Sequence, residues 1–199
     1  MFKKVLAAAI LTSCALGAQA TPIASVLANQ SSATFLTLAS GTGIGQVSGG
    51  ALLSASVNGV AAKPFNSSPT ITTVGNFLAA GPGNGGDADL HISTQFVSFL
   101  WGSPDTYNTL VVKTNTNTSG YSYTSANFPT IVFNGNQNFA SYIAFTTSGA
   151  ETMTDLIFKS TSNAFEASNF STTAVPAPAS IALLGLGLIG LGAARRKQA

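Results

Sequence analysis

The sequence of 199 residues has one cysteine, one histidine and one tryptophan, which are Cys14, His91 and Trp101. A chain with a single cysteine forms no internal disulfide and lacks the thiolate groups of a structural zinc site. One histidine adds too few ligands to build such a site from imidazoles. We therefore predict no metal and no cofactor, and we expect packing and strand pairing to stabilise the fold.

Charged residues are also scarce, at 7% of the sequence, against about 25% in an average soluble domain. Residues 21–174 hold three lysines against six acidic residues, and all other basic residues lie in 1–20 and 175–199. Because the central region has no Lys/Arg cluster, we expect no nucleic-acid binding. Its surface must be solvated by Ser, Thr, Asn, Gln and Gly, which is typical of β-rich extracellular proteins.

Residues 1–20 have the pattern of a secretory signal peptide. Lys3 and Lys4 form a basic start, and the apolar run from Val5 to Leu11 is too short to span a bilayer of about 30 Å. Ala18 and Ala20 provide the small residues that a signal peptidase requires. We predict export, with signal peptidase as a processing partner that cleaves after Ala20.

A rival cleavage site overlaps this segment. Leu11–Cys14 has the sequence Leu-Thr-Ser-Cys, which resembles a lipobox, in which the cysteine becomes a lipid-modified N-terminus. The simpler interpretation treats Cys14 as a small apolar residue of the signal peptide, and we adopt it because the Ala18–Ala20 site follows.

The region 21–174 contains short apolar runs separated by Gly, Asn, Pro and Ser clusters. This pattern predicts one all-β domain, an antiparallel β-sandwich similar to a jelly roll. No run has a convincing helical period, although residues 22–28 could form one or two helical turns. The expected strands lie within 32–39, 50–59, 70–81, 89–102, 107–114, 129–135, 141–147, 154–160 and 163–170.

The stretch WGSPDTYN, residues 101–108, has the local chemistry of a hairpin. Pro104 suits the first central position of a turn, and Asp105 can bond back to the backbone. We expect Trp101 to end one strand and Tyr107 to open the next. An alternative is that Asp105 and Asn108 bind a cation or a sugar.

Candidate catalytic groups are few. His91 lies beside Asp89 in an expected strand, and a Ser-His-Asp triad could be assembled only with a serine of unknown position. The sequence has no G-x-S-x-G motif, so we predict that the protein is not an enzyme. Asp87 and Asp89 follow a glycine-rich segment that resembles one turn of a calcium-binding repeat, but one copy cannot stack.

The segment 175–199 has three parts. Val175, Pro176, Ala177 and Pro178 precede an apolar stretch that we predict to be a transmembrane helix at about 179–194. The positively charged residues that follow place this end of the chain in the cytoplasm; they are Arg195, Arg196 and Lys197. A plain tail anchor is the alternative to a processing signal.

This arrangement resembles the PEP-CTERM sorting signal of exported bacterial proteins. The resemblance implies that exosortase is a processing partner and that the helix spans the inner membrane only transiently. It also implies that the protein then reaches the outer surface or extracellular matrix. Ala177 stands where the family has glutamate, so this chain lacks the acidic residue of the signal.

Part of the central region is similar to short surface proteins that carry this signal. Those proteins contain W-G-S-x-D-x-Y-N and a later A-F-E-x-D-N; the matching residues here are Trp101, Gly102, Ser103, Asp105, Tyr107 and Asn108, then Ala164, Phe165, Glu166 and Asn169. Ser168 replaces the aspartate of the second motif. If that aspartate helped to hold a cation, this protein has lost the ligand.

Two roles remain open for the domain. The first is a structural or adhesive role in an exopolysaccharide or biofilm layer. The second is carbohydrate binding, in which extracellular polysaccharide is the partner and aromatic rings stack on the sugar. The candidate rings are Trp101, Tyr107, Tyr121 and Tyr123.

Overall fold

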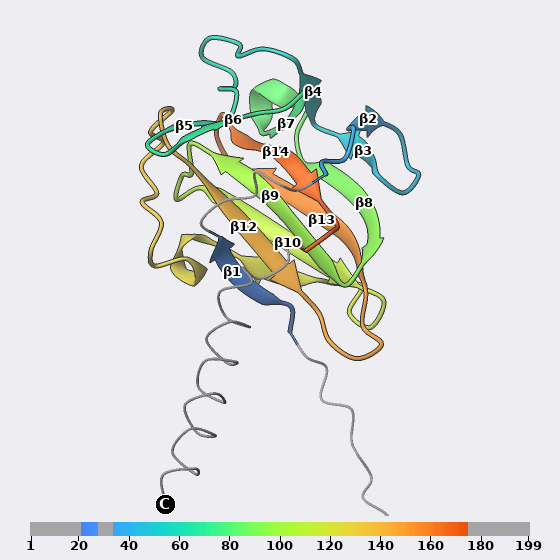
Figure 1. The fold of residues 1–199 in the computed structure, drawn as a ribbon. Coiled ribbons are helices and arrows are strands. Elements are labelled where there is room, and N and C mark those ends of the chain that lie inside the picture. Colours follow the sequence, from blue (N-terminus) through green and yellow to red (C-terminus); the bar gives the residue numbers. More distant parts are fainter. Residues whose placement is uncertain (1–20, 28–33, 175–199) are drawn as a thin grey trace, which may run out of the picture.

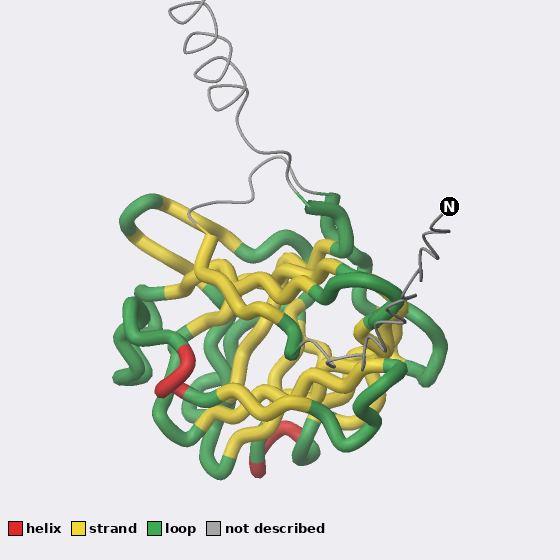
Figure 2. The backbone as a smooth tube through the Cα atoms, turned by 90° about the horizontal axis from the view of Figure 1, so that it is seen from below, coloured by secondary structure: helices red, strands yellow, loops and turns green. Residues whose placement is uncertain are grey.

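The computed structural model describes residues 21–27 and 34–174, which form an all-β fold of two six-stranded sheets and one separate hairpin (Figure 1). Seen from below, the strands lie in two layers joined by loops (Figure 2). The main hydrophobic cluster contains side chains from both sheets, including Phe99 and Phe158. The predicted antiparallel, all-β architecture is therefore confirmed.

The first sheet contains six strands, and every neighbouring pair in it is antiparallel. In spatial order, the strands are β1 (Ile23–Leu27), β12 (Ala140–Thr146), β9 (Phe96–Gly102), β14 (Phe165–Ser171), β7 (Phe77–Ala80) and β4 (Ala51–Leu53). The strand β14, which leads toward residue 175, therefore lies in the middle of this sheet and not at its edge.

The second sheet also has six strands, of which only β2 and β3 pair in parallel. Its order is β11 (Tyr121–Tyr123), β10 (Asn108–Thr114), β13 (Met153–Ser160), β8 (Ala88–Thr94), β3 (Gln46–Gly49) and β2 (Ala39–Ser40). The remaining elements are the hairpin of β5 (Phe65–Ser67) and β6 (Thr70–Thr72), and the 3-10 turns η1 (Pro82–Asn84) and η2 (Ser125–Asn127).

Aromatic rings fill the space between the sheets. Phe99 of β9 meets Phe158 of β13 edge to face, with ring centroids 5.4 Å apart, and stacks on Phe170 of β14 at 5.5 Å. Trp101 stacks on Phe165 at 4.3 Å. Offset and edge-to-face ring pairs add to the stabilisation that burial provides, so this cluster replaces the disulfides that the sequence lacks.

The strand β9 is buried on both of its faces, which its alternating sequence did not predict. Phe99 and Trp101 point into the space between the sheets. On the opposite face, Leu100 joins a second cluster against which Phe35 and Ile71 pack. Because Ile71 lies in the hairpin of β5 and β6, the hairpin and the loop near Phe35 cover this part of the first sheet.

The interpretation of residues 101–108 as a hairpin is wrong. The strand before them, β9, lies in the first sheet, and the strand after them, β10, lies in the second. The Ser103 backbone N–H donates to the carbonyl of Phe139 at 2.9 Å, and Ser103 has a positive φ of 35°. The chain therefore turns across the sandwich at this point. Likewise, the run 89–102 divides at Gln95 into β8 and β9, one in each sheet.

Other differences concern individual strands. The segment suggested as a helical turn near residue 22 contains β1, which pairs with β12. Residues 129–135 form turns and not a strand, and the described part of 32–39 contains no strand before β2. Tertiary pairing decides these segments, because their apolar residues are short runs that suit several structures.

The predicted signal peptide, the Cys14 lipidation site and the predicted transmembrane helix lie outside the described residues. Within 21–27 and 34–174, no helix is long and apolar enough to span a bilayer.

Candidate functional site

The two sequence motifs of the central region lie side by side in the first sheet. Glu166 is opposite Gly102, and Ala167 is opposite Trp101, in the antiparallel pair of β14 and β9. The segments are distant in sequence, yet the sheet register brings Ser103 to Glu166. One structural unit therefore contains both motifs.

Glu166 is almost fully buried, with 3% of its surface exposed. Its Oε2 accepts a hydrogen bond from the Ser103 hydroxyl at 2.8 Å, and its Oε1 accepts one from the Ala62 backbone N–H at 2.9 Å. Burial raises the pKa of Glu166 to about 7, and the charge of Asp105 acts in the same direction. The two hydrogen bonds lower this pKa and offset part of the effect.

A cavity of about 370 Å³ lies beside Glu166. Residues 56–62 form most of its lining, and Gln137, Asn163 and Glu166 contribute polar side chains. Amide groups and a carboxyl in a concave site are suited to a small polar ligand. This cavity was not predicted, because its lining comes from four separate parts of the sequence.

Asp105 and Tyr107 are hydrogen-bonded to each other. The Tyr107 hydroxyl donates to Asp105 Oδ2 and also lies 3.1 Å from the carbonyl oxygen of Asn163. Burial, followed by the hydrogen bond to Asp105, raises the pKa of Tyr107. The Asp105 carboxylate thus has a side-chain partner, the Tyr107 hydroxyl, whereas the sequence predicted a bond to the backbone beside it.

Trp101 and Asn108 are inside the fold. Both are fully buried, and the Asn108 side-chain oxygen accepts a hydrogen bond from Ser160 at 2.8 Å. Trp101 therefore presents no ring face to a sugar, which corrects its assignment as a stacking ring. Tyr123 is buried as well, whereas Tyr121 is partly buried and packs against the core.

The end of the second motif holds a neighbouring loop in place. The Asn169 amide donates to the Tyr142 hydroxyl and to the Thr72 carbonyl, each at 2.9 Å, and its oxygen accepts from the Val74 N–H at 2.7 Å. The hydroxyl of Ser168, which replaces the family's aspartate, is buried and bonds to Thr73 at 2.8 Å. Both side chains therefore make hydrogen bonds within the fold.

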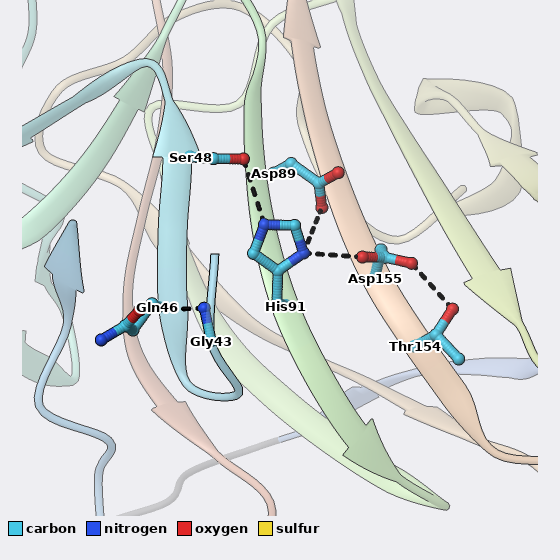
Figure 3. Close-up of polar contacts among 7 residues, drawn as sticks. All are labelled: Gly43, Gln46, Ser48, Asp89, His91, Thr154 and Asp155. Atoms are coloured by element: carbon cyan, nitrogen blue, oxygen red, sulfur yellow. Dashed lines mark hydrogen bonds and ion pairs between the residues drawn. The ribbon is translucent and has the colours of Figure 1, made fainter. Parts of the chain in front are cut away.

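A second polar cluster lies on the outer face of the second sheet (Figure 3). His91 Nδ1 is 2.8 Å from Asp155 Oδ1 and 3.9 Å from Asp89 Oδ1. His91 Nε2 is 3.1 Å from the hydroxyl oxygen of Ser48. The side chains come from β3, β8 and β13, three adjacent strands.

The surroundings of Asp89 disfavour the ionised form of its carboxyl group. Burial, and secondly the charge of Asp155, raise its pKa, while His91 and Lys113 act in the opposite direction. The sequence showed that Asp89 and His91 share a face, since they are two residues apart in a strand. It could not identify Asp155 or Ser48, whose positions depend on the pairing of β13 and β3 with β8.

Ser48, His91 and Asp155 form a hydrogen-bonded series with the order of a hydrolase triad. Hydrolysis also needs a substrate cleft and donors that stabilise an oxyanion. The cavities beside Glu166, Tyr142 and Leu36 contain none of the three residues. This hydrogen-bonded series therefore lies apart from these three cavities.

The family model of the PEP-CTERM protein-sorting motif matches residues 174–197. The chain matches no curated protein and no solved structure. The motif begins at residue 174, shortly after β14 ends at Ser171. It supports export and processing by exosortase, and it confirms the resemblance drawn from the sequence. The chain thus carries the sorting motif of PEP-CTERM proteins directly after a central strand of its sandwich.

Proposed function

We propose that this is an exported protein, sorted by exosortase, whose β-sandwich has a non-catalytic structural or adhesive role in an exopolysaccharide or biofilm layer. The signal peptide, residues 1–20, directs export, and the apolar segment at about 179–194 stays inserted in the inner membrane until exosortase acts. The processed protein is then found on the outer surface or in the extracellular matrix.

The position of β14 is the observation that carries this proposal. This strand pairs with both β9 and β7, and the sorting motif follows it. Cleavage near Pro178 therefore leaves an end that follows a strand held by two ladders in the middle of a sheet. A protein released into a matrix benefits from this arrangement, because loss of the C-terminal segment does not loosen an edge strand.

The hydrogen bonds that the motif residues make within the fold support the same role. Ser103, Glu166 and Asn169 all bond to other parts of the chain. The shared sequence pattern is explained by the needs of the fold and requires no bound substrate. A low charge content also suits a protein that packs among neutral polar polymers.

The cavity beside Glu166 favours a second candidate, carbohydrate binding. Gln137 is exposed at this cavity and offers an amide of the kind that hydrogen-bonds sugar hydroxyls. A polysaccharide pull-down with Gln137→Ala tests this role, and Asn76→Ala, an exposed amide outside this cavity, is the control. Equal retention of both variants and of the native protein would leave the structural role as the better proposal.

Deletion of exosortase tests the main proposal. Fractionation of such cells should show full-length protein in the inner membrane, whereas cells with the enzyme should hold it in the outer-surface or matrix fraction. Loss of matrix cohesion on deletion of the gene for this protein is the expected functional result. An unchanged matrix and unchanged fractionation would contradict the proposal.

A further inference from the structure

Three groups that commonly bind metal ions converge on the outer face of the second sheet. Asp89 and His91 lie two residues apart in β8, so their side chains share one face. Asp155 of β13 is directly opposite His91 in the antiparallel register. One ligand atom from each residue lies within 4.8 Å of the others.

We propose that Asp89, His91 and Asp155 bind a divalent transition-metal ion, with Zn²⁺ preferred over Ca²⁺. The ligand atoms are Asp89 Oδ1, His91 Nδ1 and Asp155 Oδ1. A nitrogen ligand favours zinc and its neighbours in the periodic table, whereas calcium takes oxygen ligands in larger number. Three protein ligands leave a coordination position for water.

The spacing of the ligand atoms suits such an ion. Two ligands at about 2.1 Å from a tetrahedral ion are about 3.4 Å apart. The separations of His91 Nδ1 from Asp155 Oδ1 and from Asp89 Oδ1, 2.8 and 3.9 Å, lie on either side of this value. Small side-chain rotations are therefore sufficient to complete the site.

Asp89 provides an independent reason to expect a ligand. Its Oδ1 atom is buried from solvent and has no hydrogen-bond partner among the described residues. A buried carboxylate oxygen without a partner is costly, and such atoms in folded proteins are usually explained by a water or an ion. This atom faces His91, where the proposed cation lies (Figure 3).

Ser48 allows the histidine to act as a ligand. A neutral ring whose Nδ1–H donates to Asp155 can accept at Nε2 from the Ser48 hydroxyl. When Nδ1 binds the metal, the proton is at Nε2 and donates to the same hydroxyl oxygen, 3.1 Å away. Metal-binding histidines commonly have such an outer partner.

Asp155 is oriented in a similar way. The Thr154 hydroxyl donates to its Oδ2 at 2.8 Å, which leaves Oδ1 directed to the histidine. Of the surrounding charges, Lys113 lies opposite Asp155 on β10 and disfavours a cation. Lys159 is paired with Asp87 at 3.1 Å. The cluster keeps a net negative charge with Lys113 included.

The only histidine in the chain gives a direct test. The full chain, labelled with ¹⁵N and purified in detergent without a polyhistidine tag, is titrated with ZnCl₂ while its imidazole nitrogens are followed by NMR. We expect one Zn²⁺ per chain, a large shift of Nδ1, and a proton retained at Nε2. Unchanged ring signals at saturating Zn²⁺, or an equal response to CaCl₂, would overturn the proposal.

Calorimetric titration with ZnCl₂ assigns the remaining ligands. Asp89→Asn and Asp155→Asn should abolish specific binding, and Ser48→Ala should weaken it about tenfold. Asp87→Asn, which removes the same charge from the exposed pair with Lys159, should bind as the native protein does. Circular dichroism verifies that each variant is folded. Native affinity in folded Asp89→Asn would overturn the site.

Discussion

Ser103 donates a hydrogen bond of 2.8 Å to Glu166, and this bond connects the end of one central strand to the beginning of its neighbour. The Ala62 N–H reaches the other carboxyl oxygen, so a single buried side chain fixes three segments. The carboxyl is well supplied with donors but poorly solvated. Its protonation state should therefore influence stability.

Glu166 should make the protein less stable as the pH rises. Its pKa is raised in the fold to about 7 from an ordinary 4.5, so the folded state binds the proton more tightly than the unfolded state. The stabilisation is fully present below pH 4.5 and is lost as the pH rises to about 7, by about 3 kcal/mol in total. Urea unfolding at several pH values measures it.

The variant Glu166→Gln is the control for this titration. Its amide keeps the shape of the side chain without an ionisable group, so its stability should change less between pH 4.5 and 7 than that of the native protein. The same pH dependence in both proteins would show that other groups, such as Asp89, are responsible.

Replacement of Asn169 should lower the stability of the fold, because its side chain makes three hydrogen bonds. Two of them hold Thr72 and Val74, and the third joins the Tyr142 hydroxyl. Asn169 also has a positive φ of 51°, which asparagine tolerates better than most residues. We expect Asn169→Ala to lose about 2–4 kcal/mol of unfolding free energy. Chemical denaturation gives this value.

Asn169→Gly separates the two causes. Glycine removes the hydrogen bonds but adopts positive φ without strain, so it should lose less stability than alanine. If Asn169→Ala were as stable as the native protein, the described contacts would not contribute to folding.

Trp101 should report on the core, because it is the only tryptophan and is fully buried. We expect blue-shifted fluorescence that moves to longer wavelength on unfolding. Trp101→Ala should lose about 3–5 kcal/mol. Trp101→Phe should lose less, since it keeps a ring and removes the buried Nε1, which has no partner among the described residues. Emission typical of a solvated indole in the folded protein would contradict this placement.

Lys113 should weaken metal binding at the proposed site. Replacement by Gln removes a positive charge opposite Asp155 and should strengthen Zn²⁺ binding roughly two- to fivefold at low salt. The gain should shrink in 1 M salt, where the screening length is about 3 Å. Lys63→Gln, in a loop that belongs to no strand of the second sheet, is the matched control. An equal gain from both variants would show a nonspecific charge effect.

The sequence predicts the all-β class and several strands, because alternation in segments such as 108–114 follows directly from one buried face. It does not predict sheet membership. Local turn chemistry at Pro104 suits a hairpin, yet Ser103 bonds to Phe139 and the chain crosses to the other sheet. Distant partners decide such choices, and they are invisible in a local pattern.

The same reason explains what could be predicted of the candidate sites. The sorting motif is contiguous, so its residues identify it. The metal cluster depends on the register between β8 and β13, and the support of Glu166 depends on a loop near Ala62. Asp89 and His91 were recognisable as neighbours, whereas Asp155 and Ser48 become relevant only when the sheet is assembled.

The central claim is that residues 175–199 act as a processing label and not as a lasting anchor. Intact mass spectrometry of the mature protein, isolated from cells that contain exosortase, tests it most directly. The account predicts a chain that begins at Thr21 and ends near Pro178, without the apolar segment or the basic tail. Pro176→Ala with Pro178→Ala should prevent this cleavage while leaving hydrophobicity similar. A mature native protein that retains its sequence through Ala199 would contradict the account and favour a plain tail anchor.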